Sequence, residues 1–185
     1  MSILFGGVRQ NGYIVEDLDA ALQHWVKAVG AGPFFVARHL PLEYFTFQGS
    51  SRIPDLSVAL GNVGDLQIEL VHQHDDAPSP YLYFRQHKGA GLQHISSWSR
   101  AYDDDLARLR ERGIVPECEG KIVGAPRFAY FGTDALDGSC YEMSDLGPDN
   151  EYGVVHDLIR EAAVDWDGSD PIRDMVLPPE QGSAA

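Results

Sequence analysis

Two glutamates stand inside apolar runs of the sequence, where a carboxylate is unexpected. Glu69 lies in the run Asp65–Leu70 (DLQIEL), and Glu142 lies between large apolar neighbours in Ser139–Met143 (SCYEM). Side chains of a strand alternate between its two faces, so each Glu faces either solvent or the inside of a curved sheet. An inward carboxylate is costly unless a partner stabilises it. A solvent-facing Glu explains either run alone, but two runs of the same form favour a pair of inward carboxylates.

The two glutamates lie at equivalent places in two similar halves of the chain. A shift of 84 residues lays Gln10 on His94 and Leu22 on Leu106, and an internal repeat is typical of a duplicated structural unit. In each half, the expected first strand carries a residue with metal-ligand chemistry, Gln10 or His94, and the last strand carries a Glu. These four side chains can converge if the two halves face each other across a pseudo-twofold axis.

Strand and helix patterns divide the first half into elements that can position these residues. Residues 8–15 suit a strand, and apolar residues at helical spacing predict a helix from about Leu18 to Val29, preceded by capping acids. Further strands are expected at residues 34–39, 44–48 and 56–61 and in the run that carries Glu69. The first half is therefore expected to have the order β-α-β-β-β.

The second half repeats this order. A strand is expected at residues 92–98, followed by a helix that begins with Asp103–Asp105, acids that we interpret as a solvated helix start. Asp137 and Gly138 predict a hairpin turn. The remaining strands are expected at residues 114–123, 128–133 and 139–145.

The expected organisation is two modules, a connection and a C-terminal extension. The modules cover residues 1–75 and 92–147, and residues 76–91 connect them with one helical turn. Residues 148–185 are expected to form an amphipathic helix, at about 151–164, and a flexible tail that is disordered from Pro178. The predicted fold class is α+β, with two βαβββ modules that form a curved mixed sheet around a central cavity.

Composition limits the kinds of partner. Twenty-eight acidic against 14 basic residues give a net charge of −14, which repels nucleic acids and anionic membrane surfaces. We find no basic leader and no apolar run of membrane-spanning length, so we expect a cytoplasmic protein. Two cysteines, Cys118 and Cys140, make neither a disulfide framework nor a Cys-rich metal site; we expect them to be reduced and semi-buried.

Four segments together resemble the vicinal oxygen chelate superfamily, which includes glyoxalase I, methylmalonyl-CoA epimerase, extradiol dioxygenases and the bleomycin- and fosfomycin-resistance proteins. The resemblance covers roughly the first 145 residues. The link from Glu69 through Ser79-Pro80 to His94 is especially similar to methylmalonyl-CoA epimerases. The segments are residues 10–18 (QNGYIVEDL), 66–71 (LQIELV), 91–95 (GLQHI) and 138–143 (GSCYEM).

The resemblance implies a metal site made by Gln10, Glu69, His94 and Glu142. Epimerases of the family usually have His where this chain has Gln10, but one class of glyoxalase I uses Gln, Glu, His and Glu in this order. One imidazole, one amide oxygen and two carboxylates suit Zn, Ni, Co or Mn. Iron is a less expected metal than these four, because the iron site of extradiol dioxygenases consists of two His and one carboxylate.

The implied activity is that of a metal-dependent isomerase, epimerase or lyase of the glyoxalase type. Such an enzyme moves a proton next to a carbonyl through a metal-stabilised enediolate or enolate. Glu142 is the first candidate for the base and Glu69 the second. The expected partner is a small molecule with a carbonyl or vicinal oxygens, and the resemblance implies a homodimer.

Aromatic residues on the expected cavity strands indicate an apolar substrate part, although core packing explains most residues of this kind. The candidate pocket residues are Phe45, Phe47, Phe128 and Tyr130.

Two other functions remain open at this stage. One is a metal-free protein that sequesters a small apolar molecule, as resistance proteins of the superfamily do; inward carboxylates oppose it because of their desolvation cost. The other is an Fe(II) extradiol ring-cleaving dioxygenase, which Gln10 opposes.

Among the other histidines, His72 and His74 are interpreted as a surface pair in preference to a second metal site. His39 and His87 could reach a pocket mouth.

Overall fold

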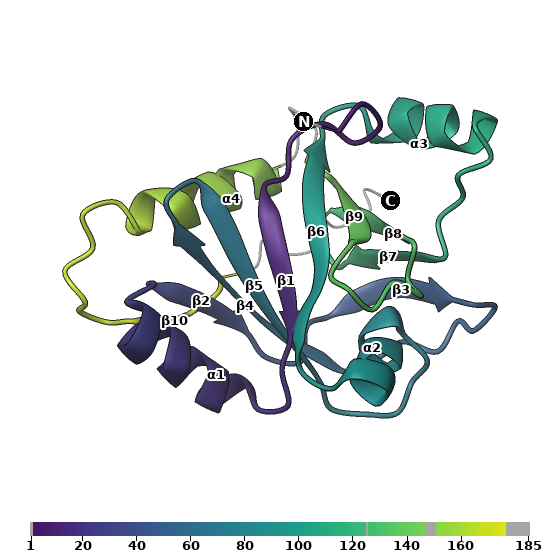
Figure 1. Ribbon diagram of the computed structural model, residues 1–185. Helices are drawn as coiled ribbons and strands as arrows, with labels where there is room; N and C mark the ends of the chain where they lie inside the picture. The colour runs from purple at the N-terminus through teal and green to yellow at the C-terminus, as the bar shows by residue number, and fades with distance from the viewer. Residues whose placement is uncertain (1, 125, 147–150, 177–185) are drawn as a thin grey trace, which may run out of the picture.

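Ten strands form one curved sheet that does not close on itself (Figure 1). The structure is a computed structural model that describes residues 2–124, 126–146 and 151–176. The strand order is β10-β2-β4-β5-β1-β6-β9-β8-β7-β3. Both parallel and antiparallel neighbours occur in it, so the expected curved mixed sheet is confirmed.

Each half of the chain contributes four consecutive strands of the sheet in the same relative order. In the first half these are β2-β4-β5-β1 and in the second β7-β8-β9-β6, with β1 and β6 meeting as antiparallel neighbours at the centre. The first set comprises β1 (Gln10–Ile14), α1 (Leu18–His24) with the π-helical turn η1 (Trp25–Val29), β2 (Phe34–Ala37), β4 (Leu56–Val63) and β5 (Leu66–Gln73). The second comprises β6 (Gly91–Ser99), α3 (Tyr102–Glu111), β7 (Cys118–Ile122), β8 (Arg127–Phe131) and β9 (Cys140–Asp145).

The strand β3 (Leu42–Phe47) departs from the expected arrangement. It was expected within the first module, but it pairs with β7 at the far edge of the sheet. Leu42, Phe45 and Phe47 are buried and Glu43 is exposed, and the pairing has a register shift between Leu42 and Tyr44. The strand therefore needs an apolar environment on one face only. Strand alternation predicts such a strand but does not identify the sheet edge that receives it.

The connection between the halves contains more helix than expected. Instead of one turn, α2 covers Pro80–Lys88. The hydroxyl of Ser79 accepts a hydrogen bond from the backbone N–H of Leu82, and Pro80 occupies the first helical position, two features that favour a helix start. The helix buries Tyr81 and Phe84 against the inner face of the sheet, and this burial stabilises its further turns.

Two predictions for the loops and the C-terminal region need correction. The strands β8 and β9 are antiparallel neighbours, but residues 132–139 connect them, so the tight hairpin turn predicted at Asp137 and Gly138 is not formed. Within this connection, Asp137 accepts a hydrogen bond from the N–H of Ser139. Residues 172–174, which were expected in a flexible tail, form β10 (Ile172–Asp174), parallel to β2. The predicted helix is present as α4 (Glu151–Ala162), whereas residues 178–185 lie outside the described residues.

Helices cover both faces of the sheet (Figure 1). On the outer face, α1 packs its Leu18 and Leu22 against β5, and α3 packs its Leu106 and Leu109 against β8 and β9. On the inner face, α2 closes one end of the concavity, and His156 of α4 contacts Trp98 of β6 at the other end.

Both cysteines are free, as expected, but they are fully buried where semi-buried side chains were expected. Among the described residues, no helix has the length and apolar content of a membrane span.

The packing of α4 on the sheet can be tested with a matched pair of substitutions. Ile159 is 2% exposed, whereas its neighbour Leu158 on the same helix is 57% exposed. We expect Ile159→Ala to lower the free energy of unfolding by about 2–4 kcal/mol, because it leaves a cavity, and Leu158→Ala to change it by less than about 0.5 kcal/mol. Urea denaturation measures both, and equal effects would show that α4 does not pack in this way.

Candidate metal centre

Three of the side chains singled out in the sequence meet on the inner face of the sheet. Glu69 comes from β5, His94 from β6 and Glu142 from β9. The Nε2 atom of His94 lies 3.1 Å from Oε2 of Glu69 and 3.3 Å from Oε2 of Glu142. The three ligand atoms lie within 4.8 Å of one another. The convergence expected from the repeat is therefore present for these three residues.

The central strand makes room for the imidazole by carrying a glycine. Gly12 of β1 is the register partner of both Glu69 in β5 and His94 in β6. A Cβ atom at Gly12 would lie 1.8 Å from Cε1 of His94 and 2.1 Å from its Nε2. The ring of His94 thus lies directly over the backbone of β1, and a side chain at Gly12 would occupy the same space.

A β-bulge in β6 orients the ring of His94. The pairing passes from Gly12–His94 to Tyr13–Leu92, so Gln93 is the extra residue of the bulge, and bulges often redirect side chains beside functional sites. The amide oxygen of Gln93 accepts a hydrogen bond from Nδ1 of His94 at 2.6 Å. With its proton on Nδ1, a neutral ring presents the lone pair of Nε2 to the two carboxylates, as a metal ligand must.

Burial and charge give the three groups different proton affinities. Burial opposes the charged form of His94, but the carboxylates of Glu142 and Glu69 outweigh it and raise the pKa of His94 to about 9. Burial, the largest influence, raises the pKa of Glu69 in spite of His94. For Glu142, burial acts in the same direction, but His94 and the hydroxyl of Ser144 together hold its pKa below the usual value. The two carboxyl groups therefore differ although both contact one imidazole.

The three ligand atoms have the character of a metal site. Oε2 of Glu69, Nε2 of His94 and Oε2 of Glu142 are all buried, and none makes an aligned hydrogen bond to another described residue. Buried polar atoms are normally satisfied, and a divalent cation satisfies a nitrogen lone pair and two carboxylates together. One imidazole and two carboxylates also match the donor preferences of Zn, Ni, Co and Mn. The residues present therefore fit a divalent ion.

Gln10, the fourth predicted ligand, lies beside this group. It is buried in β1, and its register partners are Gln67 in β5 and Ser96 in β6. Ser96 is also the register partner of Glu142 in β9. Its amide nitrogen donates a hydrogen bond of 2.8 Å to the side-chain oxygen of Gln67. This bond does not use the amide oxygen, which is the atom that a metal would bind. The role of Gln10 as a ligand stays a prediction.

The four predicted pocket residues lie on the inner face but are closely packed. Phe45, Phe47, Phe128 and Tyr130 are buried in one apolar cluster, with α2 packed into it. The ring of Tyr130 meets His94 edge to face at 5.1 Å, and its hydroxyl accepts a hydrogen bond from the hydroxyl of Tyr81. These aromatic residues form an apolar wall beside the carboxylates, and a role in substrate binding stays a prediction.

Sequence reasoning missed one side chain near the centre. His156 of α4 is buried, its ring lies 4.6 Å from the ring of Trp98, and burial lowers its pKa to about 4 although the charge of Glu142 opposes this. Its imidazole is therefore neutral at physiological pH and lies within the electrostatic influence of Glu142. The helix stripe predicted α4 itself, but no sequence pattern indicated where the helix would dock.

Comparisons with known proteins agree with this fold. Residues 9–131, more than half of the chain, match the family model of the Glyoxalase/Bleomycin resistance protein/Dioxygenase superfamily. The comparison with curated proteins found no match.

Solved structures of similar fold include epimerases. Methylmalonyl-CoA epimerase from Mycobacterium tuberculosis is 22% identical with a TM-score of 0.57, over 80% of this chain and 93% of that one. A hypothetical protein from Bacillus halodurans is 19% identical with a TM-score of 0.52, over 78% and 97%. A methylmalonyl-CoA epimerase in complex with methylmalonyl-CoA and NH4+ is 16% identical with a TM-score of 0.50, over 79% and 97%. At these identities the likeness establishes the fold alone.

The requirement for glycine below His94 gives a first prediction. We expect Gly12→Ala to displace the ring of His94, to lower the free energy of unfolding by about 1–3 kcal/mol through overpacking, and to weaken metal binding. Gly7→Ala is the control, because a Cβ there meets nothing within 4 Å. Thermal denaturation and zinc titration measure both effects. Equal behaviour of the two variants would show that His94 does not lie over Gly12.

The charge of the centre gives a second prediction, for the metal-free protein. Because the pKa of His94 is raised to about 9, above the ordinary value of about 6.5, its stabilising effect is complete below about pH 6.5 and is lost as the pH rises through about 9. An NMR titration of the chelator-treated protein should show a buried imidazole with a midpoint near pH 9. A midpoint at or below the ordinary value would contradict the ion contacts with Glu69 and Glu142.

Proposed function

The chain belongs to the Glyoxalase/Bleomycin resistance protein/Dioxygenase superfamily, and from that premise we propose that it is a metal-dependent isomerase, epimerase or lyase. The proposed reaction moves a proton on a carbon next to a carbonyl. The observation that carries this proposal is the buried meeting of Glu69, His94 and Glu142, with ligand atoms within 4.8 Å of one another.

His94 would hold the ion through Nε2, and Glu69 and Glu142 through one carboxylate oxygen each, with the amide oxygen of Gln10 as a fourth ligand. The ion is Zn, Ni, Co or Mn in this proposal, because the donor set suits these metals. When bound, such an ion draws electron density from a substrate oxygen and makes the neighbouring C–H more acidic.

The two carboxyl groups would share the proton transfer. Glu142, whose pKa is lowered, is ionised at neutral pH and can accept the proton from carbon. In the metal-free protein Glu69, whose pKa is raised, holds a proton more readily than Glu142. With the ion in place, the carboxylate that leaves the ion would take the proton from carbon. The pair thus supports a reaction in which one group removes a proton and the other supplies one.

The surroundings of the centre are largely aromatic. The ring of Tyr130 meets His94 edge to face, and Phe128 packs against Tyr130. The ring of His156 contacts Trp98 on the same strand as His94. Electrostatic interactions are stronger in such a site than in bulk water. The aromatic wall would also accept an apolar part of the substrate.

The two other functions have less support. An iron site of the ring-cleaving type resembles two imidazoles and one carboxylate, whereas the inner centre has one imidazole and two carboxylates. A metal-free sequestering pocket would bear the desolvation cost of both carboxylates, several kcal/mol per buried ion, with no chemistry in return.

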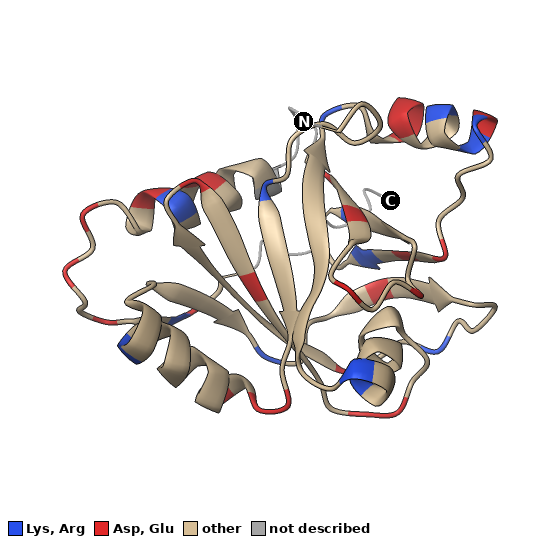
Figure 2. Ribbon diagram, in the orientation of Figure 1, with Lys and Arg blue, Asp and Glu red and all other residues tan. Residues whose placement is uncertain are grey.

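The charge distribution bears on the substrate class. Most basic side chains form ion pairs with nearby acids, for example Arg38 with Asp19 and Lys121 with Glu43, and no basic cluster is visible among the described residues (Figure 2). A coenzyme A ester, such as the methylmalonyl-CoA of the epimerase complex, carries phosphates that basic groups would have to bind. We therefore favour a small carbonyl compound as the substrate.

Hydrogen exchange tests the proposed reaction. The metal-loaded protein should catalyse deuterium incorporation from D2O at the α-carbon of at least one compound in a panel of small 2-oxo acids, 2-hydroxy aldehydes and methylmalonyl-CoA, followed by NMR. Glu142→Gln and Glu69→Gln should each reduce the exchange rate by about 10²–10⁴-fold. The control is Glu43→Gln, an exposed residue paired with Lys121, which should leave the rate unchanged. Exchange in none of the compounds, or at the wild-type rate in Glu142→Gln, would contradict the proposal.

A further inference from the structure

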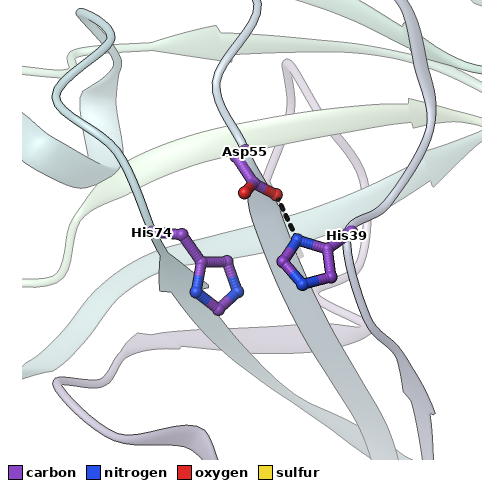
Figure 3. A group of neighbouring side chains, drawn as sticks. All are labelled: His39, Asp55 and His74. Carbon is purple, nitrogen blue, oxygen red and sulfur yellow. Dashed lines mark hydrogen bonds and ion pairs between the residues drawn. The ribbon is translucent and has the colours of Figure 1, made fainter.

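A second group of metal-ligating side chains lies on the surface of the first module, away from the inner centre. His39 lies in the loop between β2 and β3, Asp55 immediately precedes β4, and His74 immediately follows β5 (Figure 3). One ligand atom from each residue lies within 4.8 Å of the other two. The sequence predicted a surface pair of His72 and His74, and their rings do meet edge to face at 4.5 Å. The structure adds His39 and Asp55 beside His74.

The backbone holds the three residues in place. The N–H of His74 donates to the carbonyl of Asp55 at 2.9 Å, which extends the β4–β5 pairing one step beyond Leu56 and Gln73. His39 has the left-handed conformation, with φ of 51°, which is uncommon outside glycine. Its N–H donates to the hydroxyl of Ser57 at 3.1 Å. Each of the three positions is thus tied to the end of the β4–β5 hairpin.

The side chains face one another. Nδ1 of His39 lies 2.8 Å from Oδ1 of Asp55. The rings of His39 and His74 stack at 4.7 Å between centroids and 26° between planes. Nε2 of His74 lies 2.7 Å from the hydroxyl of Ser57. Figure 3 shows a ring nitrogen of His39 turned toward the carboxylate of Asp55, with the ring of His74 beside them.

We propose that His39, Asp55 and His74 bind a divalent transition-metal ion at the surface of the first module. Two imidazoles and one carboxylate suit Zn²⁺, Ni²⁺, Cu²⁺, Co²⁺ and Fe²⁺, and three protein ligands leave positions for water. The ion would tie the loop between β2 and β3 to the ends of β4 and β5. His72 is not one of the three residues whose ligand atoms lie within 4.8 Å of one another, although its ring meets that of His74 edge to face at 4.5 Å.

The surroundings allow an ion to enter from solvent. The side chains of His39 and Asp55 are 67% and 41% exposed, in contrast to the buried His94 of the inner centre. Arg38, the nearest cation in sequence, is paired with Asp19. Asp75 and Asp76 both follow His74, and Arg52 is their shared ion-pair partner, so the surrounding charge is negative and attracts cations.

Zinc binding to the full chain tests this site independently of the proposed enzyme function. Titration with ZnCl2, followed by calorimetry, should show that His39→Ala and His74→Ala each lose one equivalent of bound zinc relative to wild type. Asp55→Asn should bind that equivalent more weakly. His24→Ala, which removes an exposed histidine of α1, is the matched control and should bind as wild type does.

A second readout separates this site from the inner one. Zinc should raise the melting temperature of a Glu142→Gln variant, in which the inner centre has lost a carboxylate, and this increase should disappear when His74→Ala is added. The proposal is overturned if His39→Ala and His74→Ala bind as much zinc, as tightly, as His24→Ala does. It is also overturned if Glu142→Gln alone removes all zinc binding.

Discussion

A buried imidazole between two buried carboxylates is the interaction on which the inner face of this protein depends. Removing two carboxylates from water costs several kcal/mol each unless their charge is balanced. A protonated His94 between Glu69 and Glu142 leaves one excess negative charge, whereas a neutral ring with a divalent cation leaves none. The two carboxylates raise the pKa of His94, and burial, with the charge of Glu142, raises the pKa of Glu69. A bound cation would remove the excess negative charge.

The fold is arranged to bring these groups together. Each half of the sheet places a parallel pair of strands beside the centre, β1 with β5 and β6 with β9, so a carboxylate from each half reaches the same imidazole. Gly12 leaves space for the ring, and the amide oxygen of Gln93, the bulge residue, lies 2.6 Å from its Nδ1. The helix α2 and the aromatic residues around Tyr130 then fill one end of the concavity. The apolar core and the polar centre therefore share one face of the sheet.

Much of this arrangement could be predicted from the sequence, because it depends on local patterns and on the repeat. Alternation around Glu69 and Glu142 located two strands and two inward carboxylates, and the repeat located His94. Features set by distant contacts were not predictable: the pairing of β3 with β7 and of β10 with β2, and the docking of His156. The cluster of His39, Asp55 and His74 joins three separate segments, and only its His72–His74 spacing gave any signal.

Metal content is the measurement that tests the central claim most directly. It should be made by elemental analysis on purified, tag-free protein that carries His74→Ala, so that the surface cluster does not contribute, after loading with Zn, Ni, Co or Mn and dialysis. We predict about one ion per chain, and none when His94→Ala and Glu142→Gln are added. An absence of metal in both proteins, when both are folded, would contradict a metal centre and leave a sequestering role as the better account.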